Sequence, residues 1–205
     1  MPNSACQTKK FLHRIMTGDE KWIYFQNPKR KKSWVDPAQS STSSSINRFR
    51  RKTMLCVWWD QEGVIYYELL KPGETVNAHR YHHQQLIKLH RTLREKRPHY
   101  RKRHDKLIFL QDNAPSHTSM SKTTWRHSTG KCSPFPLTHQ ALSDYHLFSS
   151  MDHALAERHF NSYEDVRKWL NEWFASKDEE FFWRGIHKLP ERWEKCIVSE
   201  GKYFE

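Results

Sequence analysis

The chain has 205 residues, enough for one domain with a hydrophobic core. Its mean hydropathy is low, at -0.97, but aromatic residues make up 14% of it, which excludes a disordered chain. A formal net charge of +12 favours a polyanionic partner such as nucleic acid, because basic side chains that neutralise phosphates release counterions.

The sequence contains no pattern typical of a zinc site, a disulfide framework or a membrane span. The cysteines are scattered and form no CxxC pair: Cys6, Cys56, Cys132 and Cys196. No apolar run approaches the roughly 18–20 residues of a membrane span, and the polar N-terminus has no signal-peptide pattern. We therefore expect an intracellular protein.

We expect residues 1–10 to form an unstructured leader and residues 11–205 to form one α/β domain. β-branched and aromatic runs predict strands at 22–26, 33–36, 53–60, 64–70 and 107–111. The short turn between 53–60 and 64–70 predicts a β-hairpin.

Three helical segments are predicted in the second half and the middle of the chain. The first starts near Thr75 or Asn77, either of which suits an N-cap. The others cover 162–175, which begins at Ser162, and 179–195. Helical spacing favours a core role over base stacking for their aromatic residues: Trp169, Trp173, Phe174, Phe181, Phe182 and Trp183.

Three aspartates are candidates for chemistry. Asp19 lies at the start of the first predicted strand, Asp112 follows the buried run 107–111, and Asp144 lies in SDYHLF. Carboxylates gathered at one end of a sheet repel each other unless a cation neutralises them, and oxygen ligands suit Mg²⁺ or Mn²⁺. Two such ions about 3.5–4 Å apart can activate a water and stabilise a leaving 3′ oxygen. Spacing alone favours a helix cap or a turn former for any single one.

Long runs of the sequence resemble mariner-type DNA transposases. The matching runs are TGDEKWIYF, NPKRKKSWVDP, RKTMLCVWWDQEGVIYYELLKPGETVN, IFLQDNAPSHT, SDYHLF and WRGIHKLPERWEKCIVSEGKYFE. The resemblance covers about Phe11 to Glu205 and implies an RNase H-like fold, with a mixed central sheet flanked by helices. The family's three catalytic aspartates, in TGDE, DNAPSH and SDYHLF, map onto Asp19, Asp112 and Asp144.

The resemblance also implies an activity and its partners. The activity is metal-dependent cleavage of DNA at transposon ends followed by strand transfer into target DNA, with two Mg²⁺ or Mn²⁺ ions on the three aspartates. The partners are transposon-end DNA, target DNA and a second copy of the chain, in the nucleus. Neither a membrane nor a small-molecule substrate is implied.

Basic runs on both sides of a Ser-rich loop are the candidate DNA contacts. They comprise Lys29, Arg30, Lys31, Lys32, Arg48, Arg50, Arg51 and Lys52. The alternatives are a nuclear localisation signal and a solvated basic surface. Asn113 and His117 either orient Asp112 or the DNA, or make local turn hydrogen bonds.

The sequence departs from the family in two places. Nothing corresponds to the family's N-terminal helix-turn-helix region, so we expect mainly backbone-directed DNA affinity. The family has DD34D spacing, whereas 31 residues separate Asp112 from Asp144 here.

The stretch 121–142 matches the family poorly, and its Gly130, Pro134 and Pro136 disfavour a helix or a central strand. We expect the strand before Asp144 to be absent. Two functions stay open: a transposase or endonuclease impaired by these changes, and a catalytically inactive DNA-binding or dimerising remnant.

Overall fold

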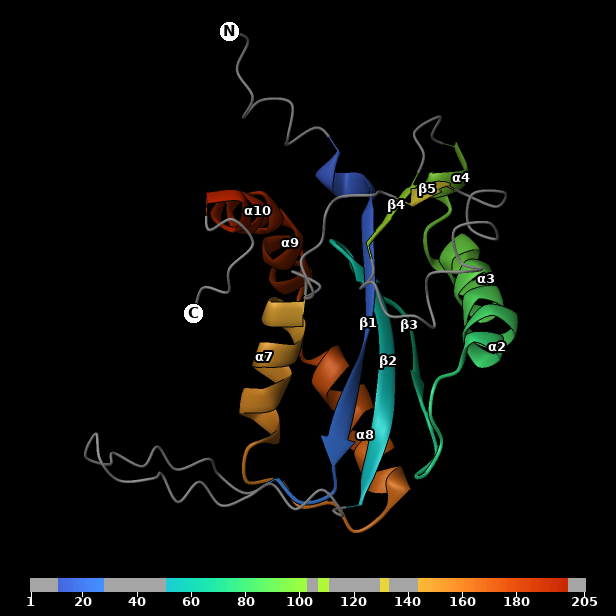
Figure 1. Cartoon of the computed structure of the whole chain (residues 1–205), viewed down its shortest axis with the longest axis vertical. Coiled ribbons are helices and arrows are strands. Elements are labelled where there is room, and N and C mark those ends of the chain that lie inside the picture. The colour runs from blue at the N-terminus through green and yellow to red at the C-terminus, as the bar shows by residue number, and fades with distance from the viewer. Residues whose placement is uncertain (1–10, 28–50, 103–106, 111–129, 133–143, 199–205) are drawn as a thin grey trace, which may run out of the picture.

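The central feature of the fold is a mixed five-stranded sheet with helices on both faces (Figure 1). The computed structural model describes residues 11–27, 51–102, 107–110, 130–132 and 144–198. The strands are β1 (Ile15–Tyr24), β2 (Lys52–Asp60), β3 (Gly63–Leu69), β4 (Leu107–Leu110) and β5 (Gly130–Cys132). Their order is β3-β2-β1-β4-β5; β1, β2 and β3 are antiparallel, and β4 and β5 run parallel to β1. The predicted α/β class, with a mixed sheet between helices, is confirmed.

Helices cover the two faces of the sheet unequally. The helical elements are η1 (Leu12–Arg14), α2 (Ala78–Arg80), η2 (Tyr81–Gln85), α3 (Leu86–Lys96), α4 (His99–Lys102), α7 (Asp144–Leu155), α8 (Tyr163–Ala175), α9 (Glu179–His187) and α10 (Leu189–Val198). Figure 1 shows α7, α8 and α9 on one side of the sheet, with α2 and α3 on the other. No helix among the described residues is long and apolar enough to cross a membrane.

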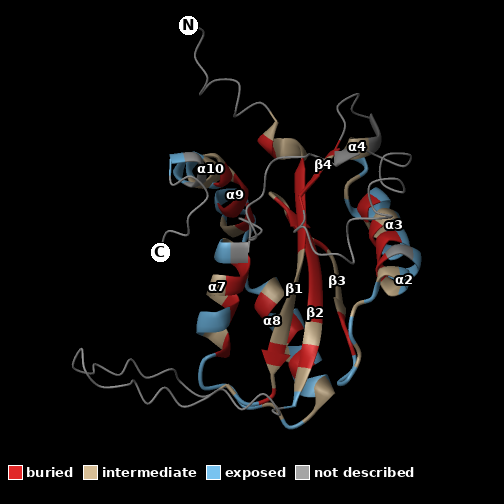
Figure 2. Cartoon of the chain, viewed as in Figure 1, coloured by how far each residue is buried: buried red, intermediate tan, exposed pale blue. Residues whose placement is uncertain are grey.

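Strand β1 is buried between two hydrophobic clusters because its side chains alternate between the faces. Ile15 and Ile23 belong to the larger cluster, beneath α7, α8 and α9. Met16 belongs to the smaller cluster, beneath α3. Figure 2 shows this buried layer along β1 and β2, with exposed residues on the outer sides of the helices.

Most of the predicted elements are confirmed, and their local causes are visible. Asn77 caps α2 by accepting a hydrogen bond from the backbone N–H of Arg80 at 2.8 Å. Ser162 and Asp165 form a reciprocal capping box at the start of α8. The predicted helical segment 179–195 is confirmed and consists of two helices, α9 and α10, with Pro190 in the first turn of α10, where a proline is tolerated.

The aromatic residues of α8 and α9 pack in or against the larger cluster, as predicted, with one exception. Trp183 is 46% exposed, so the core assignment is wrong for this residue. It stacks on His187 one turn later, at 3.7 Å between ring centroids. Its position on α9 turns it away from the stripe formed by Phe182 and Ile186, which are buried.

The expected absence of a strand before Asp144 is also wrong. Residues 130–132 form β5, which pairs in parallel with β4 from Leu107↔Gly130 to Phe109↔Cys132. A glycine is tolerated there because β5 is short and lies at the edge of the sheet, where one side needs no partner. The predicted strand 33–36 and the leader 1–10 lie outside the described residues.

A buried ion pair joins the β2–β3 hairpin to the end of α3. The Asp60 carboxylate is fully buried and accepts two hydrogen bonds from the Arg97 guanidinium, at 2.9 and 3.0 Å. It also accepts the backbone N–H of Glu62 at 2.9 Å, which shapes the hairpin turn. Burial opposes the charge on Arg97, but the hydrogen bond and charge of Asp60 outweigh it and raise the Arg97 pKa.

Gly18 lets the Trp58 ring lie directly across β1. A Cβ at position 18 would lie 2.3 Å from Trp58 Cδ1 and 2.5 Å from Nε1, closer than atoms can approach. Trp58 is buried and stacks on Tyr66 at 5.5 Å between ring centroids. The glycine therefore supports the smaller cluster immediately beside Asp19.

We predict that Arg97→Met destabilises the protein by about 3 kcal/mol, because it leaves the buried Asp60 carboxylate without its charged partner. Urea unfolding followed by circular dichroism measures the change. Arg94→Met is the matched control, since Arg94 is exposed on α3. An Arg97→Met stability within about 0.5 kcal/mol of the control would contradict the prediction.

We predict that Gly18→Ala destabilises the protein by about 1–3 kcal/mol through overpacking against Trp58, although alanine itself suits a strand better than glycine. The same substitution in a Trp58→Leu background should cost less, because the obstructing ring is gone. A double-mutant cycle in urea measures this coupling. Equal costs in both backgrounds would show that the contact is not the cause.

Candidate catalytic site

Asp19 lies in the middle of β1, and the prediction that it starts the strand is wrong. The strand begins at Ile15, because Ile15, Met16 and Thr17 pair with β4 on one edge, and residues Met16 to Tyr24 pair with β2 on the other. Asp19 is half-buried, and its Oδ1 accepts the backbone N–H of Glu20 at 2.6 Å. The carboxylate therefore projects from the most constrained strand of the sheet.

The paired residues of β1 and β4 come just before Asp19 and Asp112 in the sequence. The last described pair is Thr17↔Leu110, in parallel register. Asp19 and Asp112 each follow this pair by two residues in the sequence. Asp112 itself lies outside the described residues. Thr17 and Asp19 share the face of Ile15, which is the face that α7 covers.

Asp144 is the first residue of α7, so the placement of this helix determines where its backbone lies. Leu147, Met151 and Leu155 recur every four residues and are buried in the larger cluster. This stripe fixes α7 against the face of the sheet that carries Asp19. The structure thus brings the backbone of Asp144 to the same face as Asp19.

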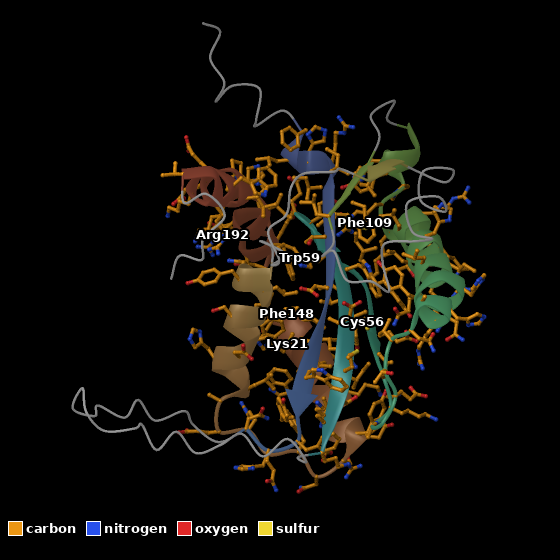
Figure 3. All side chains as sticks on the ribbon, in the orientation of Figure 1. Lys21, Cys56, Trp59, Phe109, Phe148 and Arg192 are labelled. Atoms are coloured by element: carbon orange, nitrogen blue, oxygen red, sulfur yellow. The ribbon has the colours of Figure 1, made fainter. Side chains whose placement is uncertain are left out.

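Lys21 connects β1 to α7. It lies two residues after Asp19, on the same face of the strand. Its Nζ lies 2.8 and 2.9 Å from the two carboxylate oxygens of Asp152 on α7, and 5.3 Å from the centroid of the Phe148 ring (Figure 3). The Lys21 side chain is 17% exposed and that of Asp152 is 62% exposed, so solvent screens the pair and its main effect is to tie β1 to α7.

A second connection lies where β1 ends. The backbone N–H of Phe160 donates to the carbonyl of Phe25 at 2.8 Å, and that of Glu157 donates to the carbonyl of Asn27 at 2.8 Å. Both donors lie in the connection between α7 and α8. The far end of α7 is therefore also held to β1.

His146 attaches the first turn of α7 to α9. Its Nε2 lies 2.9 Å from the carbonyl oxygen of Phe181, and the two rings are 4.4 Å apart between centroids. Because a carbonyl can only accept, Nε2 carries the proton. Burial lowers the pKa of His146, and the nearby Lys188 and Arg184 act in the same direction.

The neighbouring strand β2 carries a thiol, Cys56, that is inaccessible to solvent. Cys56 pairs with Glu20 across the β1–β2 ladder and is fully buried. Burial, with the charge of Glu20, raises the pKa of the Cys56 thiol far above its usual range. The thiol therefore stays protonated and packs as a small apolar group.

Of the three candidate aspartates, only the Asp19 side chain belongs to the described part of the chain. Within that part, no group of three or more His, Cys, Asp or Glu side chains is close enough to hold a metal ion. The half-buried carboxylate of Asp19 offers oxygen ligands, which Mg²⁺ and Mn²⁺ prefer.

Two of the predicted DNA contacts are described, and each cation lies over an aromatic ring. The Arg51 guanidinium lies 4.3 Å from the centroid of Phe25, and Lys52 Nζ lies 4.1 Å from that of Trp22. The other candidates lie outside the described residues: Lys29, Arg30, Lys31, Lys32, Arg48, Arg50, Asn113 and His117.

The sequence interpretation missed Lys21, Asp152, His146 and Gly185. Lys21 could have been found, because a residue two after Asp19 on a strand must share its face. His146 lies inside the SDYHLF run that identified Asp144. Its partner is a backbone carbonyl from a distant helix, which leaves no signal in the sequence.

Comparisons with known proteins identify relatives along nearly the whole chain. The family model "Transposase (partial DDE domain)" matches residues 24–103. The Mariner Mos1 transposase of Drosophila mauritiana is 63% identical over 206 residues, covering 98% of this chain and 59% of that protein. The chain thus spans about three-fifths of the length of this relative.

Solved structures agree with the sequence match. A pre-cleavage Mos1 transpososome is similar at a TM-score of 0.85 and 64% identity, covering 98% of this chain and 60% of that one. The Mos1 transposase catalytic domain solved with raltegravir and Mn is similar at a TM-score of 0.79 and 57% identity, covering 98% of this chain and 90% of that one. The strand order and these matches confirm the RNase H-like fold. The chain belongs to the mariner transposase family and corresponds to its catalytic domain.

Proposed function

We propose that this chain cleaves DNA phosphodiester bonds at transposon ends and joins the freed 3′ ends to target DNA. The proposal rests on the way that the paired strands β1 and β4 and the helix α7 are arranged around Asp19. The last described pair of β1 and β4, Thr17 with Leu110, lies two residues before Asp19 and two before Asp112 in the sequence. Helix α7 begins at Asp144 and packs on the face of the sheet that carries Asp19. The similarity to the catalytic domain of Mos1 transposase supports it.

Asp19, Asp112 and Asp144 would hold two Mg²⁺ or Mn²⁺ ions. Mos1 transposase catalytic domain has been solved with Mn, which supports this cofactor for the relative. Bound ions would activate a water or 3′ hydroxyl and stabilise the leaving oxygen. The protein itself orients the carboxylates: β1 carries Asp19 in a rigid ladder, and α7 carries Asp144 on a helix packed in the core.

DNA is the proposed partner, and the net charge of +12 suits its phosphates. We propose that Arg51 and Lys52, together with Lys29, Arg30, Lys31, Lys32, Arg48, Arg50, Asn113 and His117, contact it. The relative's transpososome supports an assembly on DNA, and we propose a homodimer on paired ends in the nucleus.

We propose that residues 11–205 form the catalytic domain and that the stretch 121–142 within it has diverged from the family sequence. Strand β5 at 130–132 argues for retained activity, because the sheet continues there beside β4. A catalytically inactive DNA-binding remnant is the competing outcome of the first test below.

We predict metal-dependent nicking of DNA that carries mariner ends. Asp112→Ala and Asp19→Asn should each slow nicking in Mn²⁺ at least about a hundredfold, since removing a metal ligand costs several kcal/mol in the transition state. Denaturing gel electrophoresis of end-labelled DNA measures the rate. Glu95→Gln is the matched control, because Glu95 is an exposed carboxylate on α3. DNA binding without nicking by the unmodified chain would support the inactive remnant instead.

We predict that Arg51→Gln/Lys52→Gln weakens DNA binding and lowers the slope of log affinity against log salt by about 2, because each of the two cations neutralises one phosphate. Fluorescence anisotropy at several salt concentrations measures the slope. Arg91→Gln/Arg94→Gln removes the same charge from the exposed side of α3. Equal slopes for the two double variants would mean that Arg51 and Lys52 contribute only net charge.

A further inference from the structure

We propose that His146 is a positioning residue: its contact with α9 fixes the first turn of α7, and with it the backbone that carries Asp144. This inference rests on the proposed function, because it assigns Asp144 as a metal ligand. It adds a residue outside the three aspartates, and a contact between two helices, to the machinery of the site.

The contact is built from both sides. From α7, His146 donates its Nε2 proton to the carbonyl of Phe181 at 2.9 Å. From α9, Gly185 makes room for the imidazole: a Cβ at position 185 would lie 2.7 Å from His146 Cδ2 and 2.8 Å from the far edge of Trp59. Phe181 and Gly185 are one turn apart, so a carbonyl, an aromatic ring and a bare backbone enclose one imidazole.

Among the described residues of α7, His146 makes the hydrogen bond nearest to Asp144; its neighbour Tyr145 lies under the Arg192 guanidinium, 4.1 Å from the ring centroid, which is a contact with less directional preference. His146 lies two residues into α7, whereas the Lys21–Asp152 ion pair lies eight residues from Asp144, about two helical turns away. Leu147 and Met151 fix the depth of the helix against the sheet through non-directional apolar packing. A directional hydrogen bond at the first turn additionally fixes the rotation of the helix about its axis.

An anchor near Asp144 affects activity because a catalytic carboxylate must be placed precisely. A catalytic carboxylate has to be held within about 0.5 Å of its productive position, and supporting residues typically change metal affinity by about 10–100-fold when removed. The His146 ring faces α9, and its Nε2 is bonded to Phe181. It therefore acts through the placement of α7 and is not itself a group that touches DNA or metal.

The test measures Mn²⁺ binding and DNA nicking separately on the full chain. Free Mn²⁺ is followed by electron paramagnetic resonance during titration, and nicking is followed on end-labelled DNA. His146→Ala should raise the Mn²⁺ midpoint about tenfold and slow nicking at subsaturating Mn²⁺ by a similar factor. His146→Gln, which retains a side-chain N–H donor, should recover most of both.

Two further variants separate positioning from folding. Gly185→Ala keeps His146 but occupies its space, and should raise the Mn²⁺ midpoint as His146→Ala does. His153→Ala removes an exposed histidine from the last turn of the same helix and should leave both readouts unchanged. Circular dichroism sets a temperature at which every variant is folded.

The outcomes are distinct. Folded His146→Ala with the wild-type Mn²⁺ midpoint, or folded His146→Gln with the same defect as His146→Ala, would overturn the proposal. If the unmodified chain binds Mn²⁺ without nicking DNA, the proposed function fails, and the Mn²⁺ midpoints of the variants still decide the role of His146.

Discussion

The structure depends on β1 being buried on both faces while it carries a carboxylate. A central strand pairs on both edges, so each of its side chains must enter one of two packed layers. Ile15, Ile23 and Met16 do so by hydrophobic burial. Asp19 occupies the same ladder and is half-buried between them. A half-buried carboxylate in that position offers oxygen ligands of the kind that divalent cations prefer.

The elements around β1 are arranged to hold this position rigidly. Behind it, Gly18 admits the Trp58 ring, and the Asp60–Arg97 ion pair joins the adjoining hairpin to α3. In front of it, α7 is attached through Lys21 and through the connection that follows the helix. These contacts join strand and helix at several points along β1. Rigid support on strands and helices is what a site with sub-ångström tolerance needs.

Local patterns in the sequence predicted most helices and strands but not the long-range contacts between them. The hairpin, the cap at Asn77 and the capping box at Ser162 follow from residue chemistry within a few positions, and all three are present. The full length of β1 was missed because Gly18 and the charged pair after it interrupt the apolar pattern. The strand at 130–132 was missed because edge strands tolerate residues that central strands exclude. Long-range contacts such as His146 with Phe181 have no local signature, since a carbonyl is present at every residue.

The described contacts of α7 place the backbone of Asp144. Among the described residues, these contacts come from the buried stripe of the helix, from Lys21, from the end of β1, from α9, and from Arg192 of α10, which lies over the Tyr145 ring. Removing three residues from a connection of about this length, 31 residues here, changes its closure entropy by only about 0.1 kcal/mol. The shorter spacing thus changes the cost of closing the connection only slightly, and the described contacts of α7 hold the backbone of Asp144 against the packed core.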